Sequence, residues 1–256
     1  MSTPALKEFG FNGLLNVPAS IAEPSISGWL PGDKPVAMKK LVDEWAAAGK
    51  SFRFLFAERF HAPSLEAHAL FTGKDVGMPL HFLAKVQAHP AKLTKPDAAL
   101  EGNAWMAEPA LNRLALAIWM QGPVAEVRWV ECRRGDARSI IVMCKHAHPA
   151  RQSILDVCIS PGFTQGGEPA IIDRFECTGL DGFLRVNGVW GNPHFAPRLV
   201  LNRGPLESIQ RDLPRDFESV EARILKEVSL IAKRSKESYA LARDYLDVCD
   251  KVGKAG

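Results

Sequence analysis

Hydrophobic residues recur at helical spacing in several parts of the chain. After Pro35, a run of four apolar residues follows the i, i+3, i+4, i+7 pattern of an amphipathic helix: Met38, Leu41, Val42 and Trp45. A glycine then provides a typical helix end. The same kind of pattern predicts further helices over residues 63–71, 109–120, 217–231 and 241–252.

Other segments alternate between apolar and polar residues, which is the pattern of half-buried strands. Residues 79–88 place Leu80, Phe82, Ala84 and Val86 on one side. We expect further strands at residues 51–56, 125–132, 138–146 and 153–159, and two within 169–189. Short turns join neighbouring strands, so we predict an α+β fold: an open, mostly antiparallel sheet with helices packed on one face.

The first 32 residues differ from the rest in their prolines. Pro4, Pro18, Pro24 and Pro31 break helices and remove strand donors, which predicts an irregular N-terminal arm over residues 1–32. Apolar residues in this arm indicate that it packs against the remainder. Residues 33–256 are expected to form a single α+β domain.

Composition excludes several classes of protein. The formal net charge is only +3 and the Lys/Arg pairs are isolated, so nothing indicates nucleic-acid binding. The five cysteines include no Cys-x-x-Cys, which favours a reducing compartment. We see no signal peptide and no apolar run of membrane-spanning length. The expectation is a cytoplasmic protein with no membrane partner.

Several short motifs are each weak evidence alone, but their shared order and spacing along the chain are more specific. They are Asp33-Lys34-Pro35, Glu58-Arg59-Phe60, residues 70–77, Gly122-Pro123-Val124, residues 179–186 and residues 235–248. Together they resemble the C-terminal catalytic domain of the Gfo/Idh/MocA family (glucose-fructose oxidoreductase and inositol dehydrogenase), over residues 33–252. The resemblance implies the fold of that domain and a catalytic lysine at Lys34. In the family a Rossmann domain comes first, and we expect this chain to lack it.

Two departures from the family pattern bear on the chemistry. Glu108 and Asn112 stand where the family has an aspartate and a histidine one helical turn apart. Histidine titrates near neutral pH, whereas an asparagine amide transfers no proton there. The sequence also contains no Gly-x-Gly, which dinucleotide binding needs between a strand and a helix. We therefore predict no cofactor and no cofactor-binding residues.

The candidate catalytic residues are Lys34, Glu58 and Glu108. Lys34 is held extended by the proline that follows it, Glu58 follows a buried strand, and Glu108 shares a helix face with Asn112. A lysine and a carboxylate can serve as acid and base. For each residue a structural or surface role is the competing interpretation.

The candidate substrate-binding residues lie at predicted strand ends, on a helix face or in loops. They are Arg59, Asn112, His146, His148, Trp190 and His194. His146 and His148 are two positions apart near a strand end, where both would point to the same side. That spacing suits a metal, but the sequence indicates no third ligand, so we predict no metal site.

These observations lead to three hypotheses about function. The first is a cofactor-independent lyase or isomerase that acts on a small hydroxylated compound, with aromatic compounds among the candidates. The second is the catalytic subunit of a split NAD(P)-dependent oxidoreductase that needs a separate Rossmann chain. The third is a non-catalytic binding or oligomerisation protein. Apolar positions in residues 80–86 and 140–144 also predict a homodimer formed through the sheet.

Overall fold

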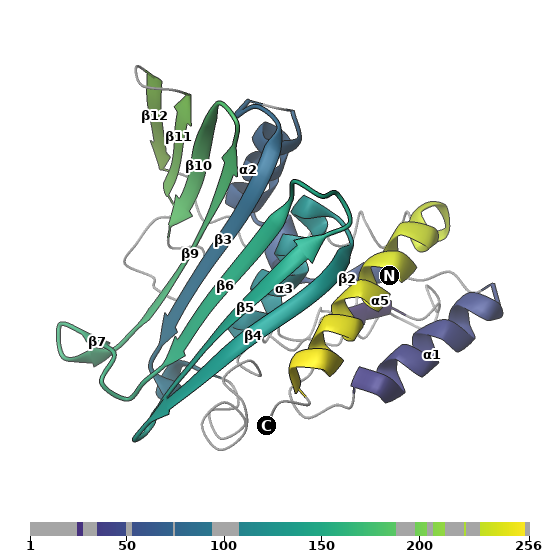
Figure 1. Ribbon diagram of the computed structural model, residues 1–256, viewed down its shortest axis with the longest axis horizontal. Coiled ribbons are helices and arrows are strands. Elements are labelled where there is room, and N and C mark those ends of the chain that lie inside the picture. Colours follow the sequence, from purple (N-terminus) through teal and green to yellow (C-terminus); the bar gives the residue numbers. More distant parts are fainter. Residues whose placement is uncertain are drawn as a thin grey trace, which may run out of the picture.

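An eight-stranded sheet forms the centre of the protein (Figure 1). The computed structural model describes residues 25–27, 35–49, 53–73, 75–93, 108–187, 198–203, 207–212, 223 and 231–253. Across the sheet the strand order is β12-β11-β10-β9-β3-β6-β5-β4. Neighbours are antiparallel except β3 and β6, which are parallel. The prediction of an α+β fold with an open, mostly antiparallel sheet is confirmed.

The strands of this sheet come from two parts of the sequence. Their bounds are β3 Pro79–Ala88, β4 Val124–Arg134, β5 Ala137–His146, β6 Gln152–Ile159, β9 Ile171–Gly179, β10 Gly182–Asn187, β11 Arg198–Arg203 and β12 Glu207–Asp212. A small hairpin, β7 Thr164–Gln165 and β8 Glu168–Pro169, lies in the connection between β6 and β9. Tight turns join β4 to β5 and β9 to β10, so these pairs are hairpins.

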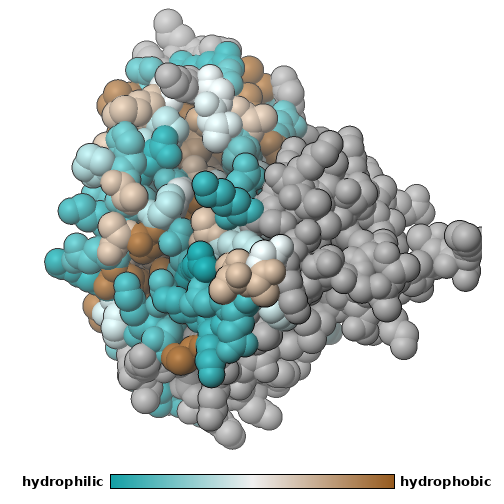
Figure 2. Space-filling view, turned by 90° about the vertical axis from the view of Figure 1, so that its right-hand side faces the viewer, coloured by the Kyte–Doolittle hydropathy of each residue, from teal (hydrophilic) through white to brown (hydrophobic). Residues whose placement is uncertain are grey.

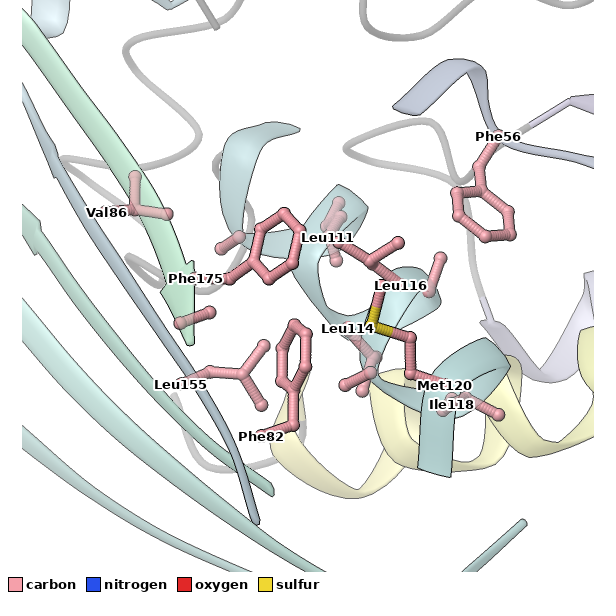
Figure 3. Packing of buried hydrophobic residues seen from close by; sticks show 14 of the residues in the cluster. Phe56, Phe82, Val86, Leu111, Leu114, Leu116, Ile118, Met120, Leu155 and Phe175 are labelled. Atoms are coloured by element: carbon pink, nitrogen blue, oxygen red, sulfur yellow. The ribbon is translucent and has the colours of Figure 1, made fainter. Parts of the chain in front are cut away.

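Helix α3 (Glu108–Gln121) covers the inner face of the sheet, and α2 (Ala62–Thr72) packs beside it. Alternation along the strands decides which face is buried: Phe82, Ala84 and Val86 of β3 are buried, whereas His81 and Leu83 are exposed. Figure 3 shows the aromatic and aliphatic side chains of the strands packed against the leucines of α3. Each fully buried Leu or Phe contributes roughly 1.5–3 kcal/mol.

A second, smaller sheet lies apart from the large one. Strand β1 (Ser25–Ser27) pairs in parallel with β2 (Arg53–Leu55), and α1 (Pro35–Ala47) connects them. The sequence predicts an irregular arm where β1 lies and a buried strand where β2 lies. A short 3₁₀ helix, η2 (Ala57–Phe60), leads from β2 into α2, and another, η3 (Pro90–Lys92), follows β3.

The C-terminal helix α5 (Ile231–Gly253) lies between α1 and the edge of the large sheet (Figure 1). Its buried stripe recurs at helical spacing and consists of Ala242, Tyr245, Leu246, Val248, Cys249 and Val252. Two ion pairs, Lys39–Asp247 and Asp43–Arg243, join it to α1. On this side of the molecule the described surface is mainly hydrophilic, with separate hydrophobic spots (Figure 2). Within the described ranges, no helix is long and apolar enough to cross a membrane.

One ion pair is completely enclosed between α3 and the sheet. The Nε of Arg113 donates to Oδ1 of Asp173 on β9 over 2.5 Å, and both side chains are 0% exposed. The guanidinium also lies 5.0 Å from the ring centre of Phe175. Burial raises the pKa of Asp173, and the charge of Arg113 opposes that rise. The pair fixes α3 against β9 within the apolar core.

Removing one partner of this pair should destabilise the fold strongly. Asp173→Ala leaves a guanidinium buried without its carboxylate, and we expect a loss of about 3–5 kcal/mol in the free energy of unfolding, measured by urea denaturation. The double variant Arg113→Met, Asp173→Leu removes both charges and should recover most of that loss. An Asp173→Ala protein as stable as the unchanged chain would contradict this account.

Candidate functional site

A cavity of about 280 Å³ opens where three elements meet at the end of α3. Arg59 of η2 lies on one side and Trp119 of α3 on another. The third wall is one face of α5, with Glu237, Leu241 and Asp244 at spacings of four and three residues. Residues at these spacings share a helix face, so both carboxyl-bearing side chains reach the cavity.

Trp119 forms the aromatic wall of this cavity. The ring of His68, from α2, is stacked on it with centroids 3.8 Å apart and planes 7° apart. The Arg59 guanidinium lies 5.2 Å from the Trp119 ring centre, a cation–π distance. Burial, with a smaller contribution from the charge of Arg59, lowers the pKa of His68 to about 4. His68 is therefore neutral at physiological pH, and Arg59 carries the positive charge of the cavity.

The α5 wall supplies negative charge. Asp244 is half-buried, and burial raises the pKa of its carboxyl group; the neighbouring Asp247 adds to the rise and Lys39 opposes it. Glu237 is exposed at the rim. Among the described residues, no hydrogen bond or ion pair involves either carboxylate. A half-buried carboxylate without a donor is costly, and a bound cation would relieve that cost.

Of the substrate-binding residues predicted from the sequence, Arg59 is the one that lines this cavity. Asn112 is buried in the first half of α3. It lies ten residues before Gly122, which lines the cavity. Ten residues span roughly 15 Å along a helix. Glu58 and Glu108 belong to η2 and α3, but their side chains lie outside the described residues, as do Lys34, Trp190 and His194. The roles assigned to these residues stay predictions.

His146 is buried and makes two hydrogen bonds at the end of α3. Its Nδ1 is 2.7 Å from the carbonyl oxygen of Gly122, and its Nε2 is 2.6 Å from Oγ of Ser153. A carbonyl oxygen only accepts, so Nδ1 carries the proton and Nε2 accepts from the Ser153 hydroxyl. The neutral imidazole thus ties α3 to β6.

His148 lies in a different environment, because β5 ends at His146 and the chain turns. His148 is exposed, and its Nδ1 accepts from the backbone N–H of Ala150 over 3.3 Å. The two histidines therefore do not share a surface. In the part of the chain that is described, no group of three or more His, Cys, Asp or Glu could hold a metal ion.

The burial and hydrogen bonds of His146 predict that the free energy of unfolding falls at acid pH. Burial lowers the pKa of His146 below 6.5, and its hydrogen bond to Gly122 offsets only part of that shift. The unfolded chain therefore takes up the proton at higher pH than the folded chain. The stabilisation is complete above about pH 6.5 and is lost as the pH falls through the lower folded pKa. His146→Gln should show a shallower fall in the free energy of unfolding between neutral and acid pH.

Urea unfolding at several pH values measures this fall, with His148→Gln as the matched control that keeps the steeper dependence. His68, whose pKa is also lowered, contributes equally to all three proteins. An unchanged pH dependence in His146→Gln would show that this imidazole is not responsible.

Sequence reasoning missed Trp119, Glu237 and Asp244. The sequence does place two acidic residues, Glu237 and Asp244, on the same helix face as Leu241, and this pattern indicates a negatively charged patch on the last helix. What the sequence does not indicate is that this face and Arg59 line the same cavity, because η2 and α5 are about 180 positions apart in the chain.

No protein-family model and no curated protein sequence matches this chain. Solved structures do resemble it. An oxidoreductase from Agrobacterium radiobacter in complex with NAD⁺, L-tartaric acid and magnesium is 16% identical, with a TM-score of 0.67, over 93% of this chain and 72% of that one. A dehydrogenase from Chromobacterium violaceum is 14% identical, with a TM-score of 0.69, over 90% and 68%. The aldose-aldose oxidoreductase from Caulobacter crescentus, complexed with glycerol, is 16% identical, with a TM-score of 0.65, over 92% and 70%.

This finding corrects the first functional hypothesis. These three solved proteins are oxidoreductases or dehydrogenases, and the one from Agrobacterium radiobacter is in complex with NAD⁺. The prediction of a cofactor-independent lyase or isomerase is therefore wrong, and the oxidoreductase alternative is favoured. At these identities the likeness establishes architecture: the chain has the fold of the Gfo/Idh/MocA-type oxidoreductases.

Proposed function

We propose that this chain is the substrate-binding and catalytic part of an NAD(P)-dependent oxidoreductase, and that a separate Rossmann-type subunit holds the nucleotide. The observation that carries the proposal is the small parallel sheet. Strands β1 and β2, joined through α1, form a βαβ unit that stands apart from the large antiparallel sheet. Nucleotide-binding domains are built from such units.

The βαβ unit is too small to be a domain. Each of its strands has three residues, and among the described residues the sheet contains no third strand. Parallel sheets occur almost only in larger assemblies that are covered on both faces, and a two-stranded sheet is marginal in water. A unit of this kind is expected to complete its sheet by pairing with the parallel strands of a nucleotide-binding partner.

The residues of this chain do not by themselves fit a dinucleotide. A pyrophosphate is held by a glycine-rich turn and by free N–H groups at a helix N-terminus. The sequence has no Gly-x-Gly, and α1, α2 and α3 carry Pro35, Pro63 and Pro109 in their first turns, where proline offers no N–H. We therefore assign to this chain the binding and orientation of substrate, and no step that involves the nucleotide.

Within that role, Arg59 is proposed to orient a hydroxyl or anionic group of the substrate, because its guanidinium lines the cavity. Lys34 immediately precedes α1 in sequence and remains the proposed catalytic lysine, with Glu58 and Glu108 as proposed carboxylates. Asn112 can donate and accept hydrogen bonds but does not serve as an acid or base near neutral pH.

Nucleotide binding by the chain alone and in complex tests this proposal. Isothermal titration of the purified chain with NADH should give no binding. A complex with a Rossmann-type subunit from the same gene cluster, obtained by co-expression, should bind NADH. Ile26→Pro should abolish the complex, because proline removes a backbone donor from β1. Thr164→Pro, in the β7–β8 hairpin, is the control and should leave it intact.

Two results would overturn the split arrangement. One is tight NADH binding by the chain on its own. The other is a complex that forms equally well with Ile26→Pro, since the βαβ unit would then not be its docking element.

We also propose that the chain forms a homodimer through the open face of the large sheet. Leu83, Ile154 and Met143 stand directly opposite one another on β3, β6 and β5. Each is about 40% exposed, and Val130 on the neighbouring β4 is 63% exposed. On β4 the residue opposite Met143 is Arg128, whereas Val130 stands opposite Ile141, which is 41% exposed. An apolar row across three adjacent strands, with Val130 and Ile141 beside it, is typical of an interface, and stable interfaces bury about 1,200–2,000 Å² in total.

A charge placed in this row should dissociate the dimer. Ile154→Lys puts an ammonium group at the centre of the face, and light scattering after size-exclusion chromatography should then report a monomer. Leu180→Lys is the control, because Leu180 is equally apolar and 64% exposed but lies in the β9–β10 turn. A monomeric unchanged chain would refute this interface.

A cytoplasmic location is proposed on the chemistry of the cysteines. All five are free thiols, and Cys132 is exposed. Exposed free thiols persist in reducing compartments and are oxidised outside them.

A further inference from the structure

We infer that the cavity between η2, α3 and α5 binds a polyhydroxylated compound that carries a protonated amine, of the amino-sugar class. Naming this compound as the substrate rests on the proposed function; the binding itself does not. The inference comes from the charges, the polar groups and the walls of the cavity.

The charges in the cavity favour a cation. Among the described residues that line the cavity, two carboxylates, Glu237 and Asp244, accompany one guanidinium, that of Arg59, which leaves one negative charge in excess. Asp244 is half-buried, and in the described part of the chain no donor reaches it. Lys39, whose charge acts on Asp244, forms its ion pair with Asp247 instead. A ligand ammonium would give Asp244 the charge-assisted hydrogen bond that the protein does not supply.

Other groups in the cavity suit hydroxyls and a carbon ring. Arg59 and Ser238 line the cavity, and each already has a partner within the protein. A guanidinium has five N–H donors and a hydroxyl group both donates and accepts, so both side chains can also bind ligand oxygens. Ile118, Leu241 and Pro123 add apolar surface against which ring C–H groups can pack. The face of Trp119 toward His68 is already covered by that ring, so stacking of a flat aromatic ligand is not favoured there.

The two carboxylates differ in burial and therefore in how much each contributes to binding the amine. Asp244 lies deeper, where solvent screens a charge less, and burial has already raised the pKa of its carboxyl group. Glu237 is exposed at the rim, where an ion pair contributes little. Asp244 is therefore the group on which recognition of the amine depends, and Glu237 assists entry.

Matched sugars test the inference without nucleotide or partner. At mildly acidic pH, where the amine is protonated, isothermal titration should show that D-glucosamine binds roughly 10-fold or more tightly than D-glucose or N-acetyl-D-glucosamine. Asp244→Asn should remove this preference and leave glucose binding unchanged. Glu237→Gln should weaken glucosamine binding only about 2-fold. Asp136→Asn, in the exposed β4–β5 turn, is the matched control and should behave as the unchanged chain.

Thermal unfolding monitors the folding of each variant. Asp244→Asn should not lower the melting temperature, because it removes an unpaired half-buried charge. Equal binding of the three sugars, no binding of any, or a preference that survives Asp244→Asn would each overturn the inference. Those results leave the nucleotide test unaffected, and equal binding of the three sugars would point to an uncharged substrate. Conversely, amine-dependent binding together with a failed nucleotide test would keep the cavity as a binding site and remove its redox role.

Discussion

Burial of α3 against the inner face of the large sheet is the interaction on which the rest of the structure depends. The leucines of α3 fill the space beneath Phe82 and Phe175. This packing sets the distance between helix and sheet but not the position of the helix along its own axis. Two polar contacts fix that position: Arg113 with Asp173 in the first half, and Gly122 with His146 just after the end. Since Trp119 and Gly122 line the cavity, its shape follows from where α3 is held.

Helix α5 connects the two sheets. One side of it packs on α3 and β4, and another faces α1 and β2. The contact with the sheet side is mainly apolar, through residues such as Tyr245 and Val248, whereas ion pairs supplement the contact with α1. Val42 of α1 is fully buried in the same apolar cluster, so apolar packing as well as ion pairs holds the βαβ unit against α5.

Local patterns were sufficient to predict most of the fold, because alternation and helical spacing report which face of an element is buried. The strand over residues 79–88 and the helix over residues 109–120 have nearly the predicted bounds. The parallel pairing of β1 with β2 was not predictable, since one member is three residues long and lies in a proline-rich segment. The candidate site was predicted only through Arg59. The spacing of His146 and His148 predicted that both side chains point to the same side, and they do not. His146 is hydrogen-bonded to Gly122 and Ser153, and His148 lies beyond the end of the strand.

Identities of 14–16% establish the architecture and leave the side chains of a site unconstrained, so charge and burial in this chain decide what the cavity binds. Asn112 brings no proton carrier to the first half of α3, while Asp244 brings an ionisable carboxyl group to the cavity at the other end. A half-buried carboxylate opposite Arg59 distinguishes charged from neutral ligands more sharply than an amide does, because leaving it unpaired has a larger cost. The neutral ligands that this cavity excludes therefore define the chemistry of the protein as much as its fold does.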